Sequence, residues 1–109
     1  MSDTKITLYH ANWCGHCVNF LPTWKALKDV FNLNNIKHEE YEDSANPKVI
    51  KEANINGFPT IRISKNNKEY DYNGPRTPDD ILHAVIPNLQ IGGNNKTTKR
   101  HMINYKNVS

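Results

Sequence analysis

Two cysteines, Cys14 and Cys17, are the residues of this chain whose type and spacing point most directly to chemistry. They are the only cysteines in the 109 residues and form a Cys-x-x-Cys pair in the stretch Trp13-Cys14-Gly15-His16-Cys17. At the start of a helix, such a pair places its first sulfur beside unpaired backbone N–H groups and the positive end of the helix dipole, which favours the thiolate. A thiolate attacks disulfides, and a second thiol nearby can close a new one. The pair therefore predicts reversible disulfide chemistry with Cys14 as the nucleophile.

The segments around the cysteines predict a junction between a strand and a helix. Residues 6–11 form an apolar, β-branched and aromatic run that is typical of a strand. After the motif, apolar residues recur at spacings of three and four, which indicates a helix with one face in a core. Pro22 lies inside this pattern, where it removes one backbone hydrogen bond and kinks the helix. We expect the helix to end near residues 32–35.

The rest of the chain predicts two more helices and three more strands. Asparagine or threonine followed by proline marks the start of each helix, since the first residue caps the helix and proline suits its first turn. Alternating residues on either side of a polar turn predict that the last two strands form a hairpin. The expected elements are a strand at 36–41, a helix at 47–54, strands at 60–64 and 69–72, and a helix from residue 78 that Pro87 bends or closes.

The order strand, helix, strand, helix, strand, strand, helix predicts an α/β fold with a four-stranded mixed sheet. A strand–helix–strand unit makes two parallel strands through a right-handed crossover, and the hairpin adds an antiparallel edge to the same sheet. We expect the helices to flank this sheet as layers.

Charge divides the chain into residues 1–91, a single predicted domain, and residues 92–109, a basic tail that we expect to be flexible. The first part holds ten Lys and Arg against eleven Asp and Glu, whereas the tail holds four Lys and Arg and no acid. The tail opens with a Gly-Gly pair and shows no apolar periodicity. Tyr105 is its only aromatic residue, which disfavours nucleic acid as a partner. A membrane span is not expected, because no apolar run approaches a length of about eighteen residues.

The two ends of the sequence favour a cytoplasmic location. Residues 1–5 lack the basic and apolar regions of a secretory leader, and residues 105–109 carry no retention signal. Structural disulfides are rare in a reducing cytosol, so an isolated Cys-x-x-Cys pair there is expected to be catalytic.

Three separated motifs resemble the thioredoxin superfamily of thiol oxidoreductases, and most closely the catalytic domains of protein disulfide isomerases. The motifs are Trp13-Cys14-Gly15-His16-Cys17, Gly57-Phe58-Pro59-Thr60 and Tyr72-Asn73-Gly74-Pro75-Arg76-Thr77. Pro22 also matches the proline inside the family's long helix. The resemblance covers about residues 6–91 and implies a minimal thioredoxin fold, because the first strand and helix of a full domain have no room before residue 6.

The resemblance implies a role for each cysteine and its neighbours. Cys14 would attack a substrate disulfide, and Cys17 would resolve the mixed disulfide by attacking Cys14; the reverse sequence oxidises a dithiol. Gly15 would allow a tight turn, and His16 would stabilise the Cys14 thiolate and raise the reduction potential. Trp13 would form an apolar shoulder over the active site.

The other two motifs imply substrate contacts and a modulating cation. A cis Pro59 would turn the Phe58 backbone toward Cys14, where an extended substrate pairs with it as an added strand. Arg76 would approach the active site and lower the pKa of Cys17. The alternative for Arg76 is an exposed cation at the start of the last helix.

One departure from the family concerns a buried acid, which family members place six residues before the first cysteine to accept the proton of the second thiol. Leu8 occupies that position in this chain. His10 points to the same side of the strand as Leu8 and lies closer to Cys14, because side chains alternate along a strand. His10 therefore either takes over the proton or is a packing residue.

These observations predict a protein dithiol–disulfide oxidoreductase that needs no bound cofactor other than its own Cys14–Cys17 disulfide. Its expected partners are protein thiol or disulfide substrates and an electron partner, which is a thioredoxin-reductase-like enzyme, glutathione or a thiol oxidase. Two alternatives stay open: a redox-inactive adaptor that keeps the fold for peptide binding, and a metal-binding or iron–sulfur module. A metal site would draw on the two cysteines and on the five histidines, His10, His16, His38, His83 and His101.

Overall fold

The computed structural model describes residues 3–88, and the predicted basic tail at 92–109 lies outside the described residues. The elements follow the predicted order of strand, helix, strand, helix, strand, strand, helix. They are β1 (Thr4–His10), α1 (Gly15–Leu33), β2 (Lys37–Glu42), α2 (Pro47–Glu52), β3 (Thr60–Lys65), β4 (Lys68–Asp71) and α3 (Pro78–Val85). The predicted series of elements is confirmed, with small shifts at the ends.

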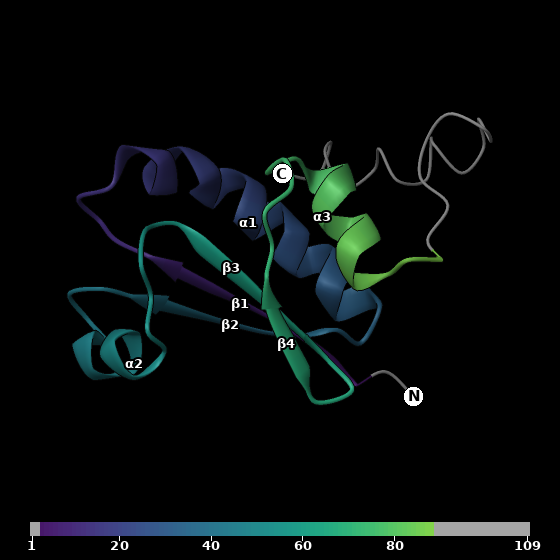
Figure 1. Cartoon of the computed structure of the whole chain (residues 1–109). Helices are drawn as coiled ribbons and strands as arrows, with labels where there is room; N and C mark the ends of the chain where they lie inside the picture. The colour runs from purple at the N-terminus through teal and green to yellow at the C-terminus, as the bar shows by residue number, and fades with distance from the viewer. Residues whose placement is uncertain (1–2, 89–109) are drawn as a thin grey trace.

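The four strands form one mixed sheet in the order β2-β1-β3-β4. β1 and β2 are parallel and are joined by the crossover through α1. β3 is antiparallel to both β1 and β4, so the hairpin adds an antiparallel edge as predicted. In Figure 1, α1 and α3 lie on one face of the sheet and α2 lies on the other. This arrangement confirms the α/β fold with a four-stranded mixed sheet and flanking helices.

The hydrophobic core lies between the sheet and the helices α1 and α3. Alternate residues of β1 and β3 point into it, since strand side chains alternate between faces, and the apolar stripe of α1 covers them. The largest core side chains with less than 2% exposure are Trp24, Phe31, Ile6, Leu8, Leu27, Ile63, Ile81 and Leu82. The core therefore holds β1 and α1 against each other, and the cysteines lie where one ends and the other begins.

Local sequence signals decide where the two shorter helices begin and end. The side chain of Thr77 caps α3. α2 ends at Glu52, earlier than predicted, because Asn54 takes a left-handed φ of 58° that stops a helix. α3 ends at Val85, because Pro87 has no backbone N–H and restricts the residue before it. Within residues 3–88, none of the helices has the length and apolar character needed to cross a membrane.

The sheet face opposite α1 is covered by α2 and by polar and aromatic side chains. Arg62 of β3 lies over the Tyr9 ring, with its guanidinium carbon 5.4 Å from the ring centroid. Tyr9 in turn stacks on Tyr41 of β2, with ring centroids 5.9 Å apart. Tyr9 and Thr7 are buried on this face, so long side chains supply part of its cover.

Candidate active site

Cys14 lies at the N-terminus of α1 as its N-cap residue. Its sulfur accepts a hydrogen bond from the backbone N–H of Cys17 at 3.2 Å. Its thiol donates to the carbonyl oxygen of Phe58 at 3.6 Å. Both cysteines are free thiols. An amide of the first helical turn therefore points at the sulfur that the sequence assigns as the nucleophile, as expected where a helix start stabilises negative charge.

Cys17 follows in the first turn of α1 and is 1% exposed, against 8% for Cys14. Burial, together with the hydrogen bond to Cys14, raises the pKa of the Cys17 thiol to about 11. Two smaller effects lower the pKa of Cys17. They come from the backbone of Ala11, which packs against the cysteines, and from the charge of Arg76. Cys17 is therefore protonated at neutral pH and must lose its proton before it can attack another sulfur.

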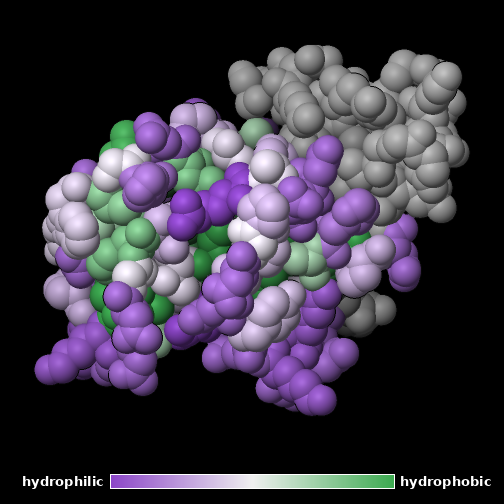
Figure 2. All heavy atoms as spheres, turned by 45° about the horizontal axis from the view of Figure 1, so that its top comes forward, coloured by the Kyte–Doolittle hydropathy of each residue, from purple (hydrophilic) through white to green (hydrophobic). Residues whose placement is uncertain are grey.

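An apolar rim borders Cys14. Trp13 is 69% exposed and Val18 is 51% exposed. The Trp13 ring meets the Phe58 ring edge to face, with centroids 5.6 Å apart, and the indole N–H donates to Asp43 at 3.2 Å. Figure 2 shows hydrophobic residues gathered at the end of the molecule where α1 begins, within a surface that is otherwise mostly hydrophilic. The indole is thus held beside the nucleophile while its apolar surface stays open to solvent.

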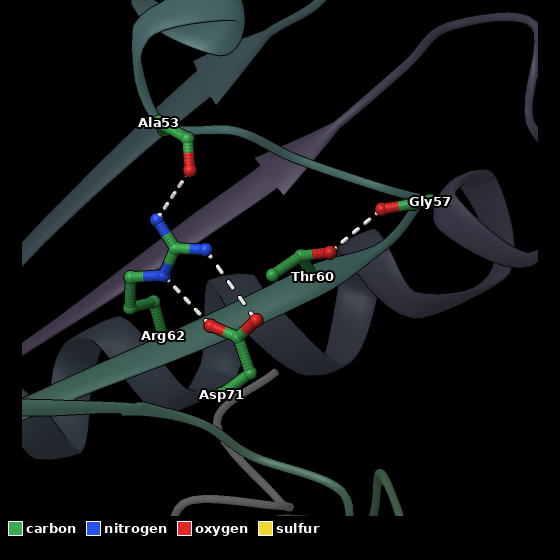
Figure 3. Close-up of polar contacts among 5 residues, drawn as sticks. All are labelled: Ala53, Gly57, Thr60, Arg62 and Asp71. Atoms are coloured by element: carbon green, nitrogen blue, oxygen red, sulfur yellow. Dashed lines mark hydrogen bonds and ion pairs between the residues drawn. The ribbon is translucent and has the colours of Figure 1, made fainter.

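The loop before β3 brings the Phe58 backbone to Cys14. The peptide bond between Phe58 and Pro59 is cis. Behind it, the hydroxyl of Thr60 donates to the carbonyl oxygen of Gly57 at 2.6 Å, which closes the loop on itself (Figure 3). The second sequence motif and the cysteine motif, which are more than forty residues apart, therefore meet at one sulfur.

Arg62 fixes the other end of the same loop (Figure 3). Its guanidinium donates to the carbonyl oxygen of Ala53, just after α2, at 2.8 Å. It also donates to both carboxylate oxygens of Asp71 on β4, at 2.7 and 3.4 Å. The hydrogen bond with Asp71 raises the pKa of Arg62, so the guanidinium stays charged. One side chain thus joins α2, β3 and β4 outside the core.

Arg76 lies in the exposed segment between β4 and α3. Together with Pro59, Tyr72 and their neighbours it lines a hollow of about 390 Å³. The hydroxyl of Tyr72 donates to the carbonyl oxygen of Pro75 at 2.6 Å, which holds this segment in place. Arg76 is thus exposed, and its charge also reaches Cys17 and lowers the pKa of that thiol.

Gly15 and His16, between the two cysteines, are both exposed in the first turn of α1. Gly15, expected to allow a tight turn, is the first residue of the helix. A Cβ added there would meet no atom within 4 Å, so the packing gives no reason for glycine. His16 faces solvent rather than the core, beside the sulfur that it is expected to stabilise.

The position at which family members carry a buried acid holds Leu8, which is fully buried. His10, two residues further along β1, is 7% exposed. Its Nδ1 atom is buried and has no hydrogen-bond partner among the residues that the structure describes. In the register of the parallel strands, Glu42 lies opposite His10 and Glu40 lies opposite Leu8.

Glu40 and Glu42 were missed by the sequence reasoning, although two acids spaced by two in a strand share one face. Partial burial disfavours the Glu40 anion, but hydrogen bonds from Lys28 at 2.9 Å and Trp24 at 2.7 Å outweigh it and lower the pKa. The pKa of Glu42 is lowered by backbone N–H groups, chiefly that of Asn12 at 2.9 Å. Both carboxylates are therefore anions at neutral pH.

The histidines proposed as metal ligands do not gather around the cysteines. Within residues 3–88, no three His, Cys, Asp or Glu side chains are grouped as a metal site. His38 instead lies with its Nε2 3.0 Å from the side-chain oxygen of Asn32, and His83 belongs to the last turn of α3. His101 lies outside the described residues.

Curated relatives of this chain are protein disulfide isomerases. The chain is 34% identical over 91 residues to "Protein disulfide-isomerase" of Saccharomyces cerevisiae, which is 81% of this chain and 17% of that protein. It is 34% identical over 88 residues to "Protein disulfide-isomerase A6" of Homo sapiens, which is 75% of this chain and 19% of that protein. The chain thus spans less than a fifth of the length of these relatives.

Solved structures of the same fold include a thioredoxin domain of mouse protein disulfide-isomerase A4. Its first thioredoxin domain matches with a TM-score of 0.67 and 26% identity, over 86% of this chain and 71% of that one. The J-Trx1 fragment of ERdj5 matches with a TM-score of 0.70 and 15% identity, over 79% of this chain and 43% of that one.

These comparisons overturn the prediction of a cytoplasmic location. The protein disulfide isomerases, ERdj5 and ERp44 are endoplasmic reticulum proteins, which argues against that location. The prediction depended on the two ends of the sequence. Ends carry no such information in a chain that spans 17% of a relative's length.

The family model of thioredoxin matches residues 2–101, which is most of the chain. This match agrees with the sheet order, with the cysteine pair at the start of α1 and with the cis-proline loop beside it. The chain therefore belongs to the thioredoxin family.

Proposed function

We propose that this chain is a protein dithiol–disulfide oxidoreductase that works through a reversible disulfide between Cys14 and Cys17. One observation carries the proposal: Cys14 caps α1, with the amide of Cys17 3.2 Å from its sulfur and the Phe58 carbonyl 3.6 Å away. The sulfur thus has a helix start behind it and the backbone of the cis-proline loop beside it. A nucleophilic thiol that must bind and release polypeptides needs both.

In the reductive direction, the Cys14 thiolate attacks one sulfur of a substrate disulfide, and the other substrate sulfur leaves as a thiolate. Cys17 then attacks Cys14, which closes the protein's own disulfide and releases the second substrate thiol. Run backward, the same steps oxidise a substrate dithiol. His16, exposed between the cysteines, is proposed to stabilise the Cys14 thiolate and so to favour the reduced form.

Substrate is proposed to bind as an extended segment along the Phe58 backbone, as an added strand does. The edge-to-face pair of Trp13 and Phe58 offers apolar surface to the side chains of that segment. The electrons come from thiols, so the proposed mechanism uses no cofactor beyond the cysteine pair. A thioredoxin-reductase-like enzyme, glutathione or a thiol oxidase is the proposed electron partner.

An insulin-reduction assay with dithiothreitol tests the activity. The wild-type chain is expected to accelerate precipitation of the reduced insulin chains, and the Cys14→Ser variant is expected to show only the rate without protein. Equal curves for the two proteins would instead support a redox-inactive adaptor.

The direction of electron flow is decided by the reduction potential, measured in glutathione buffers. A value near about −270 mV indicates a reductase like thioredoxin, and one near about −180 mV indicates an oxidase or isomerase. Because the relatives in sequence are isomerases, we expect the second value.

A further inference from the structure

The proposed reaction needs a proton acceptor for Cys17. In the reduced protein, a pKa of about 11 leaves only about one Cys17 in 10⁴ as a thiolate at pH 7. In the mixed disulfide the Cys14 thiol is gone, but burial, the largest cause, still raises the pKa of Cys17. Resolution of the mixed disulfide would be slow if Cys17 depended on its small thiolate fraction alone. Leu8, at the position of the family's acid, can accept no proton.

His10, the last residue of β1, is a buried titratable side chain that the proposed reaction leaves unused. It directly precedes Ala11, which packs against Cys14 and Cys17 and whose backbone lowers the pKa of Cys17. Its Nδ1 is buried with no hydrogen-bond partner among the residues that the structure describes, which is rare for a buried polar atom. In the tautomer that carries its proton on Nε2, Nδ1 holds a free lone pair. A free, buried base thus lies one residue from the backbone that contacts Cys17.

Two carboxylates of β2 lie on the same face of the sheet as His10. Glu42 lies opposite it in the register of β2, and Glu40 lies two residues away on the same face. Hydrogen bonds lower the pKa of both carboxyls, so both are anions at neutral pH. The other charged groups here are Lys28, which is paired with Glu40 at 2.9 Å, and Arg76, whose charge reaches Cys17. The carboxylates are thus the charged groups that the register of the two strands places beside His10.

We propose that His10 accepts the Cys17 proton during resolution of the mixed disulfide, and that Glu40 and Glu42 together stabilise the imidazolium. The inference rests on the proposed function. In it, His10 and the carboxylates of the neighbouring strand take the place of the single buried acid of the family. The proton passes through one water, since Nδ1 makes no direct hydrogen bond to Cys17.

The step balances without an added reagent. Cys17 gives its proton to Nδ1, and the Cys17 thiolate attacks the Cys14 sulfur. The Cys14–Cys17 bond forms while the bond from Cys14 to the substrate sulfur breaks, and the electron pair leaves with that sulfur. The imidazolium then returns its proton, through solvent, to the substrate thiolate. The protein dithiol is oxidised and the substrate disulfide is reduced.

A stopped-flow experiment with a symmetric nitrobenzoate disulfide separates the two steps. Attack by Cys14 releases the first coloured thiolate, and attack by Cys17 releases the second. In His10→Phe we expect an unchanged first release and a second release slowed by about 100-fold at pH 7, the usual size of a general-base effect. The wild-type second rate is expected to depend less steeply on pH than that of the variant, whose rate should rise about tenfold per pH unit because only the Cys17 thiolate attacks.

Matched variants distinguish proton transfer from packing. His10→Gln keeps a polar side chain but cannot take up a proton, so it should match His10→Phe even if the phenyl ring disturbs folding. Glu42→Gln removes one anion and should slow the second release by a smaller factor than His10→Gln does. His38→Phe, on β2 and beside Phe31 with ring centroids 6.0 Å apart, should leave both releases unchanged.

Two results would overturn the inference in different ways. A wild-type second rate and pH profile in both His10 variants, with normal thermal unfolding, would show that His10 only packs. A wild-type protein that gives no first release would contradict the proposed function itself, and the role of His10 with it.

Discussion

The surroundings of Cys14 and those of Cys17 differ sharply, although one turn of α1 separates them. Around Cys14 the neighbours Trp13 and His16 are exposed, and a backbone carbonyl lies within reach. Around Cys17, at 1% exposure, lies Ala11, the residue that follows β1. The difference indicates how position sets the order of the two steps in the proposed reaction. Cys14, the less buried sulfur at 8% exposure, would meet the substrate first, and Cys17 would then react with its neighbour.

The largest expected effect comes from removing the more buried sulfur, that of Cys17. In Cys17→Ser, Cys14 should still attack a substrate disulfide and form a mixed disulfide. The variant should not release the substrate, because a serine hydroxyl does not attack a disulfide at neutral pH. A stable adduct with a disulfide-bearing protein should therefore appear on a non-reducing gel and vanish on reduction. Cys14→Ser is the matched control and should form none. An adduct through Cys17 in that control would reverse the assignment of the two sulfurs.

A smaller but more direct effect is expected in the pH dependence of alkylation. In Cys14→Ala the hydrogen bond between the sulfurs is lost, but burial still raises the pKa of Cys17. Its alkylation by iodoacetamide should therefore rise about tenfold per pH unit between pH 7 and 9 without levelling, since only the thiolate reacts. The alkylation rate at each pH is measured from mass spectra of samples that are quenched at successive times. Levelling near pH 8, as for a free cysteine, would show that burial does not separate the two thiols.

The smallest expected effect concerns Arg76, whose positive charge lowers the pKa of Cys17. Arg76→Gln should raise that pKa and slow resolution at pH 7 by about two- to fivefold, because an exposed charge is screened by water and salt. The slowing should shrink in high salt. Lys48→Gln, which removes an exposed cation from α2 on the other face of the sheet, is the control for net charge and should not change the pKa of Cys17.

Much of the fold followed from the sequence because its signals are local. Alternation in β1 and β3, the spacing of three and four in α1, and caps followed by proline each act within a few residues. The position of Cys14 was predictable for the same reason. The cis bond at Pro59 came from the resemblance alone, since nothing in the tetrapeptide around it demands that isomer.

The rest of the site depends on register, which local patterns do not report. Glu40 and Glu42 looked like ordinary surface charges of a hydrophilic strand. Only the pairing of β2 with β1 places them beside Leu8 and His10. The role of Gly15 came from the resemblance, and the start of α1 at this residue depends on the whole strand-to-helix junction rather than on the glycine alone.

The contacts of Arg62 and Thr60 have a consequence for the energy of substrate capture. They hold both ends of the loop that presents the Phe58 carbonyl, at Ala53 and at Gly57. An edge that is ordered before the substrate arrives costs little conformational entropy at the moment of binding. In the proposed mode of binding, a short peptide, which must itself become ordered, would need only a few backbone contacts to be held and could be released once its disulfide has exchanged. Polar side chains outside the cysteine pair would thus contribute to weak, reversible binding.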